Sequence, residues 1–93
     1  MATAKIVEIG KGGLDAGKET TKGWNNPPLG NVLGFWVQPE KLEDTGFVTG
    51  QPAFQITKVE TRMNKPDHFV VNVTVKNTGN VAWGFELFMS FLG

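Results

Sequence analysis

Apolar and polar residues alternate along residues 69–75, and this pattern predicts a β-strand with one buried face. The apolar set is Phe69, Val71, Val73 and Val75. Val70 is the single apolar residue among the polar positions between them. Residues 54–63 are rich in β-branched side chains, and Pro66 follows in a segment of turn residues, where it cannot donate to a strand ladder. We therefore predict an antiparallel hairpin over residues 53–76.

The first strand of this hairpin changes the phase of its alternation. Phe54 and Ile56 occupy even positions, whereas Val59 and Met63 occupy odd positions. A regular strand sends successive side chains to opposite faces, so it cannot bury both pairs on one face. We predict a β-bulge or a twist near residues 57–58 that resets the phase.

The last predicted strand covers residues 81–92 and follows a turn in which Gly79 can adopt a positive φ. Six apolar residues share one face of this strand: Val81, Trp83, Phe85, Leu87, Met89 and Phe91. The other face also becomes apolar towards its end, through Phe88 and Leu92. Two apolar faces indicate a central strand, or a strand that another subunit buries.

Glycine, proline and asparagine divide the first half of the chain into short segments. Residues 5–9, 32–37 and 47–49 are strand candidates, and residues 14–23 fit a loop or an irregular edge strand. Residues 24–30 contain two prolines and predict a rigid extended loop. A single helical turn is expected at residues 39–44.

Together these segments predict an all-β fold, in which six or seven short strands form one antiparallel β-sandwich domain over residues 1–93. A jelly-roll-like arrangement fits this pattern, and the resemblance described next implies the immunoglobulin-like type instead. A chain of 93 residues can bury one modest core.

The C-terminal part of the chain resembles a known class of module. The residues that carry the resemblance are Val71-Asn72-Val73-Thr74-Val75-Lys76-Asn77-Thr78-Gly79-Asn80-Val81, followed by an alternating apolar strand. This run is similar to the penultimate strand, turn and last strand of CARDB-like and related immunoglobulin-type β-sandwich modules of bacteria and archaea. The resemblance covers about the last quarter of the chain. It implies a β-sandwich with an accessory, adhesive or structural role, and it does not identify any functional residue in this chain.

Composition narrows the classes of partner. The net charge is zero and the charges are dispersed, which argues against nucleic acid or an anionic membrane surface as the partner. The chain has no cysteine, so disulfides and thiolate metal sites are not available. No apolar run approaches the ~20 residues of a membrane span.

The first six residues are too short and polar for a signal peptide. Three localisations therefore stay open: retention in the cell or particle that makes the protein, export without a cleaved leader, or a mature form whose leader has been removed.

A phosphate-binding motif is matched only in part. The run from Gly12 to Lys18 satisfies G-x-x-x-x-G-K, but Glu19 stands where a P-loop needs Ser or Thr for Mg²⁺. Gly23 and Pro27 then follow where a helix should provide the positive end of its dipole. A glycine loop is the preferred interpretation, and we expect no nucleotide cofactor.

Other candidates for catalysis and metal binding are weak. Ser90 and His68 are the only serine and histidine, and a triad would need both to converge on a carboxylate such as Asp67. Oxygen ligands for Ca²⁺ are conceivable in two acidic groups, Glu40 with Glu43 and Asp44, and Asp15 with Glu19. A solvated face is the preferred interpretation of the first group because Lys41 lies within it. We therefore expect a non-enzymatic protein without catalytic residues, metal ligands or cofactors.

Self-association is the leading functional hypothesis. Val70, Phe88 and Leu92 lie on faces that one chain could leave uncovered, and a terminal strand is expected to leave an open edge that favours pairing. Glu86 is the only charged residue of that strand. The opposing possibility is that residues 31–37 cover Phe88 and Leu92 within the chain. The expected partner is a second copy or another protein.

Carbohydrate binding is the alternative hypothesis. Trp24, Asn25 and Asn26 could present an indole and two amides to a sugar from the predicted loop. The opposing possibility is that Trp24 plugs one end of the sandwich. Trp36 and Trp83 are expected in the core.

Overall fold

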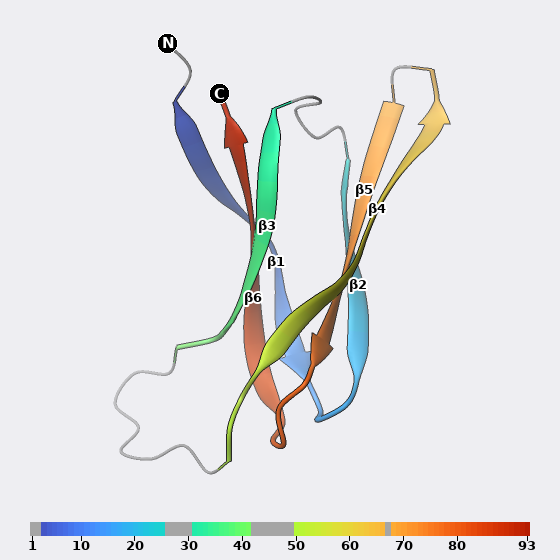
Figure 1. Cartoon of the computed structure of the whole chain (residues 1–93). Helices are drawn as coiled ribbons and strands as arrows, with labels where there is room; N and C mark the ends of the chain where they lie inside the picture. The colour runs from blue at the N-terminus through green and yellow to red at the C-terminus, as the bar shows by residue number, and fades with distance from the viewer. Residues whose placement is uncertain (1–2, 26–30, 42–49, 67) are drawn as a thin grey trace.

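The computed structural model describes residues 3–25, 31–41, 50–66 and 68–93, and within them the chain forms six β-strands and no helix (Figure 1). The strands are β1 (Ala4–Leu14), β2 (Glu19–Asn25), β3 (Val32–Pro39), β4 (Phe54–Lys65), β5 (His68–Asn77) and β6 (Trp83–Leu92). The prediction of an all-β fold is confirmed. The described residues include no helix with the length and apolar character needed to cross a membrane.

The strands form two antiparallel sheets of three strands each, with the orders β1-β6-β3 and β2-β5-β4. The sheets lie as two layers, as a β-sandwich requires (Figure 1). The layers are close together where β1 ends and β6 begins, and they diverge towards the opposite end (Figure 1). The central strands β5 and β6 follow each other in the sequence but belong to different layers.

The core consists of side chains from these two central strands. Among the described residues, six hydrophobic ones are buried: Val71, Val73 and Val75 from β5, and Phe85, Leu87 and Met89 from β6. Alternation puts each set on the face of its strand that looks toward the other layer. Each fully buried side chain contributes about 1.5–3 kcal/mol to folding. The outer strands add half-buried residues around this core, among them Phe54, whose ring centroid lies 5.5 Å from that of Phe85.

The predicted hairpin and its bulge are confirmed. β4 pairs with β5, and the register shifts between Ile56 and Lys58, so that residue 57 is the additional one. Val59 then lies opposite Val73, on the same face of the sheet as the core. Val59 is nevertheless 48% exposed and Met63 63% exposed, because β4 is an edge strand in a layer that diverges from the other.

The N-terminal half contains longer strands than predicted. β1 continues through the glycine-rich segment to Leu14 because Gly10 and Gly12 pair with Leu87 and Phe85 of β6. Gly10 also makes room for Lys22 of β2, since a Cβ at residue 10 would lie 2.9 Å from the Lys22 Cγ. β2 contains Trp24 and Asn25, so the prediction that these two residues belong to a loop is wrong.

Two other predicted elements lie largely outside the described residues. The described residues do not include 47–49, which are predicted to form a strand. They also do not include residues 42–44 of the predicted helical turn. Of that turn, Pro39 belongs to β3, which ends there.

The β5–β6 turn uses glycine in a different way from the one predicted. Among the described glycines, positive φ occurs at Gly17 (79°) and Gly50 (90°), and not at Gly79. At Gly79 a Cβ would overlap the carbonyl oxygen of Gln51 and lie 2.7 Å from the nitrogen of Ala53. Close approach of two backbone segments is therefore what requires glycine at this position.

Candidate interaction surface

The outer face of the β1-β6-β3 sheet carries the side chains that point away from the other layer. On β6 these include Phe88 and Ser90, which alternate with the buried Leu87 and Met89. Residues directly opposite in a ladder share a face. Ile6 lies opposite Ser90, and Trp36 lies opposite Phe88, so β1 and β3 add apolar side chains to the same face. No described strand covers this face, because all six belong to the two layers.

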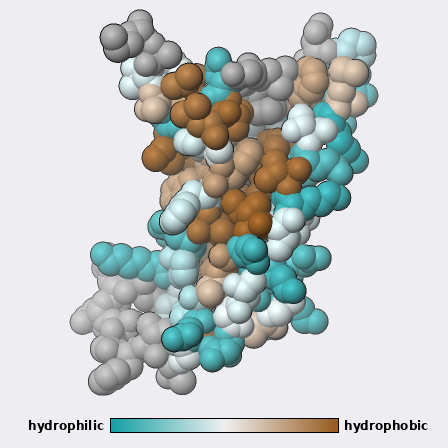
Figure 2. All heavy atoms as spheres, viewed as in Figure 1, coloured by the Kyte–Doolittle hydropathy of each residue, from teal (hydrophilic) through white to brown (hydrophobic). Residues whose placement is uncertain are grey.

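The part of this outer face that Ile6, Trp36 and Phe88 form is apolar, although Glu8 lies opposite Phe88 on the same face. Ile6 is 75% exposed and Trp36 is 65% exposed, while Phe88 between them is half-buried. Hydrophobic residues reach the surface over the upper part of this layer and in the opening between the layers, whereas hydrophilic residues border the layer that contains β4 (Figure 2). Exposed apolar groups that lie next to one another indicate an interaction site more strongly than single exposed residues do.

A shallow hollow of about 550 Å³ lies in this face. It is lined by Ile6, Gly34, Phe35, Trp36, Gln38, Phe88 and Ser90. None of these seven residues ionises. The two polar side chains are hydrogen-bonded within the chain: the Trp36 Nε1–H donates to Gln38 Oε1 at 3.1 Å, and Ser90 Oγ donates to the carbonyl oxygen of Gly34 at 3.4 Å. The hollow therefore offers apolar contact and little polar recognition.

The structure separates the residues predicted for self-association. Phe88 and Leu92 lie on this outer face and are half-buried. The possibility that residues 31–37 cover them is wrong, because β3 lies beside β6 in the same sheet and widens the face. Val70 lies opposite Asn25 and Arg62, on the outer face of the other sheet. It therefore does not join the same surface.

The prediction that the terminal strand leaves an open edge is also wrong. β6 is the central strand of its sheet and pairs with β1 on one side and β3 on the other. The first strand of the chain therefore takes the edge position next to it. The edges of the described sheets are β1, β3, β2 and β4.

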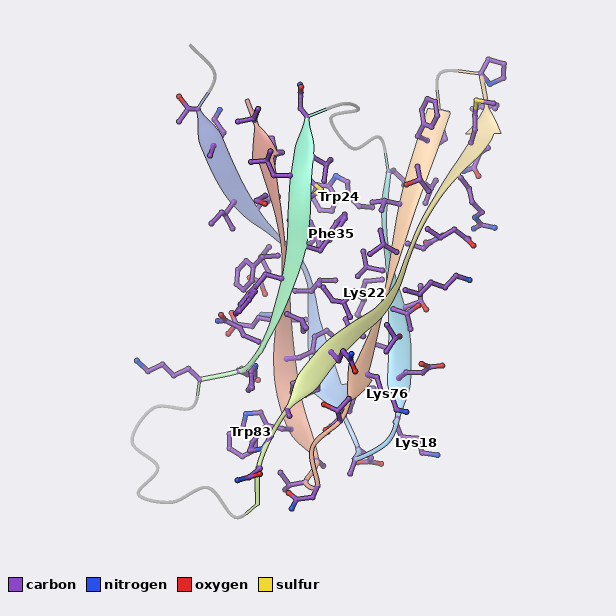
Figure 3. All side chains as sticks on the ribbon, viewed as in Figure 1. Lys18, Lys22, Trp24, Phe35, Lys76 and Trp83 are labelled. Atoms are coloured by element: carbon purple, nitrogen blue, oxygen red, sulfur yellow. The ribbon has the colours of Figure 1, made fainter. Side chains whose placement is uncertain are left out.

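The two tryptophans expected in the core differ. Trp36 is largely exposed, so that expectation is wrong for it. It shares the outward face of β3 with Gln38, while Phe35 and Val37 pack against the core. Trp83 is half-buried at the narrow end of the sandwich, and its Nε1–H donates to the carbonyl oxygen of Glu40 at 2.8 Å (Figure 3).

The residues predicted for carbohydrate binding do not face one another. Trp24 lies opposite Val71 and packs against the core, and it points toward Phe35 between the two layers (Figure 3). Asn25 is the next residue in the strand and is exposed on the opposite face. Asn26 lies outside the described residues. The geometry favours a plug at this end of the sandwich over a sugar platform.

The weaker catalytic and metal candidates do not converge in the described part of the chain. Ser90 and His68 belong to strands of different sheets, and each is on the outward face. The segment with P-loop spacing forms the end of β1 and a turn, and strand β2 follows it where a phosphate site needs a helix. No group of three potential metal ligands occurs among the described residues, and Glu43 and Asp44 lie outside them.

Comparisons with protein-family models, with curated proteins and with solved structures found no match to this chain. The immunoglobulin-like type of sandwich and the CARDB-like resemblance stay predictions. The function is therefore inferred from the exposed apolar residues on the outer face of the β1-β6-β3 sheet.

Proposed function

We propose that this chain is a non-enzymatic structural module that associates with a second copy of itself through the outer face of the β1-β6-β3 sheet. The observation that carries the proposal is the exposure of Trp36 and Ile6 on either side of Phe88. An accessory or structural role also agrees with the class of modules that the C-terminal strands resemble.

The magnitude of the burial supports an interface that uses several residues from each copy. Trp36 leaves roughly 150 Å² of its surface exposed, and burial at about 25 cal/mol per Å² is worth about 4 kcal/mol. Association costs about 4–15 kcal/mol in lost translational and rotational freedom. One indole is therefore insufficient, whereas two indoles together with Ile6 and Phe88 from both copies are sufficient for a weak dimer.

A carbohydrate would find fewer contacts here. Trp24 packs inward, so a sugar would have to stack on Trp36. The polar side chains that line the same hollow are Gln38 and Ser90, and both are hydrogen-bonded within the chain. Sugar hydroxyls need such partners, so apolar association is the better-supported function.

The test is the solution mass of the chain over a range of concentrations, by sedimentation or light scattering. The natural chain is expected to shift from 10.2 kDa toward twice that mass as concentration rises. Ile6→Glu is expected to hold it at the monomer mass, because it places a charge in the lining of the apolar hollow. Met63→Glu is the matched control, since Met63 is 63% exposed on the other sheet and its substitution is expected to leave association unchanged. A natural chain that stays monomeric at every concentration would rule out the proposal.

A further inference from the structure

The edge strand β3 lacks the charges that the other edge strands carry. Residues Val32–Pro39 contain no charged side chain. The other three edge strands of the described sheets carry Lys5, Glu8 and Lys11 on β1, Glu19 and Lys22 on β2, and Lys58, Glu60, Arg62 and Lys65 on β4. Charges on an edge oppose pairing with another chain. β3 is thus the edge of the described chain that is least protected from such pairing.

The backbone of β3 presents hydrogen-bonding groups to this open side. Bonded and non-bonded pairs alternate along an antiparallel ladder. The Glu40 N–H donates to the carbonyl oxygen of Gly84 at 2.8 Å, in register with the pairing of β3 and β6. The alternation then directs the backbone groups of Trp36 toward β6 and those of Phe35 and Val37 away from it. Within the described residues, no strand pairs with that side of β3 (Figure 1).

We propose that β3 pairs antiparallel with β3 of a second copy, in a register centred on Phe35, so that the partner's Trp36 lies opposite Gly34 and fills the hollow. This inference rests on the proposed self-association. It adds the strand edge at which the two copies pair, the register of that pairing, and the residue that enters the hollow. The pairing would join the two β1-β6-β3 sheets into one continuous sheet of six strands around a twofold axis.

The space around Gly34 fits this register. An added Cβ at Gly34 would meet no atom within 4 Å, so the outer face is open there. Ile6, Ser90 and Gly34 form one row across the three strands. The partner's Trp36 continues this row and lies over the hollow that the same three residues line. An aromatic residue opposite a glycine is a recognised way to stabilise an edge pair.

Neighbouring registers fit less well. A register centred on Trp36 puts Trp36 opposite the partner's Trp36 and Gly34 opposite Gln38, so no tryptophan lies opposite Gly34. A register centred on Val37 puts Pro39 opposite Phe35, where proline has no N–H to donate. The Phe35-centred register bonds Phe35 to the partner's Phe35, and both carry an N–H. Leu33 is the additional residue of the bulge between Val32 and Gly34, so the alternation does not extend to it.

The test exchanges the two residues of the proposed pair. Trp36→Gly and Gly34→Trp are each expected to weaken association about 100-fold, since either one destroys both symmetric tryptophan–glycine pairs. The double variant that combines Gly34→Trp with Trp36→Gly restores these pairs with the roles exchanged, and it is expected to recover most of the association. Gly34 has no positive φ and has open space above it, so Gly34→Trp is compatible with the fold.

The outcomes distinguish this inference from the proposed function. If Gly34→Trp associates as tightly as the natural chain, or more tightly, the apolar face associates without this register, so the edge inference fails while the proposed function stands. If the natural chain is monomeric throughout, both fail.

Hydrogen exchange of the natural chain tests the same edge without substitution. The amides of Phe35 and Val37 are expected to gain protection as concentration rises, while amides on the outer side of β4 do not. Unchanged protection of Phe35 and Val37 in an associating sample would overturn the edge pairing.

Discussion

The side-chain amide of Asn77 donates a hydrogen bond to the carbonyl oxygen of Leu14 at 2.9 Å, and so joins the end of β5 in one layer to the end of β1 in the other. The same amide donates to the carbonyl oxygen of Val81 at 2.9 Å, and its oxygen accepts from the Gly79 N–H at 2.9 Å. Asn77 is fully buried. Its amide therefore holds both layers and the β5–β6 turn together where the sandwich is narrowest.

Asn77→Asp is expected to destabilise the fold by about 3 kcal/mol near neutral pH, because a buried carboxylate would face two carbonyl oxygens without a proton to donate. The variant is expected to regain stability as the pH falls, since a protonated carboxyl group can donate to one of them. Urea unfolding at several pH values measures both effects. Asn25→Asp is the control, because Asn25 is exposed, and a similar loss in that variant would contradict the role assigned to Asn77.

Gly79→Ala is expected to cost about 2 kcal/mol or more, because the new methyl group would overlap the backbone of Gln51 and push the turn away from β4. Gly13→Ala provides the comparison, since a Cβ there comes no closer than 3.9 Å to its nearest neighbour, the carbonyl oxygen of Trp83. Equal unfolding midpoints for the two variants would show that close approach does not explain the glycine at residue 79.

Leu87→Ala is expected to lower the free energy of unfolding by about 3–4 kcal/mol, because Leu87 is fully buried in a small core. Val59→Ala removes a side chain that is 48% exposed on the diverging edge, and a loss below about 1 kcal/mol is expected. Chemical denaturation of both variants checks the contrast. Comparable losses would mean that the layers close over Val59 in solution.

Trp24→Ala is expected to lower stability by about 2 kcal/mol, because the indole is half-buried against the core. It is not expected to change binding in a glycan screen. Loss of a sugar signal with unchanged stability would instead restore the carbohydrate-binding hypothesis for this residue.

Local patterns in the sequence predict the β4–β5 hairpin well. The phase change between Ile56 and Val59 predicts a bulge or a twist, because a strand of strict period two has no other way to bring both residues to one face. The two apolar faces of residues 81–92 predict a central strand, which β6 is. These features depend on residues that are close together in the sequence, so local patterns of apolar and polar residues are enough to predict them.

The candidate surface could be predicted only in part. Phe88 and Leu92 are identified by the apolar second face of their strand, but Ile6 and Trp36 are not. Residues 32–37 are apolar on both faces, so periodicity does not tell which side of β3 faces solvent. That choice follows from the register between β3 and β6, and the edge position of β3 follows from the strand order. Both are long-range properties that no local pattern encodes.

Every fully buried hydrophobic side chain in the described structure belongs to β5 or β6. During synthesis, β1 to β4 therefore emerge from the ribosome before the residues that form the core exist. No earlier part of the described chain can condense around a core of its own, and the uncharged β3 stays accessible until β6 arrives to pair with it. The core of the described structure therefore cannot form before β6 has been translated, and until then the strands that precede it are exposed to aggregation.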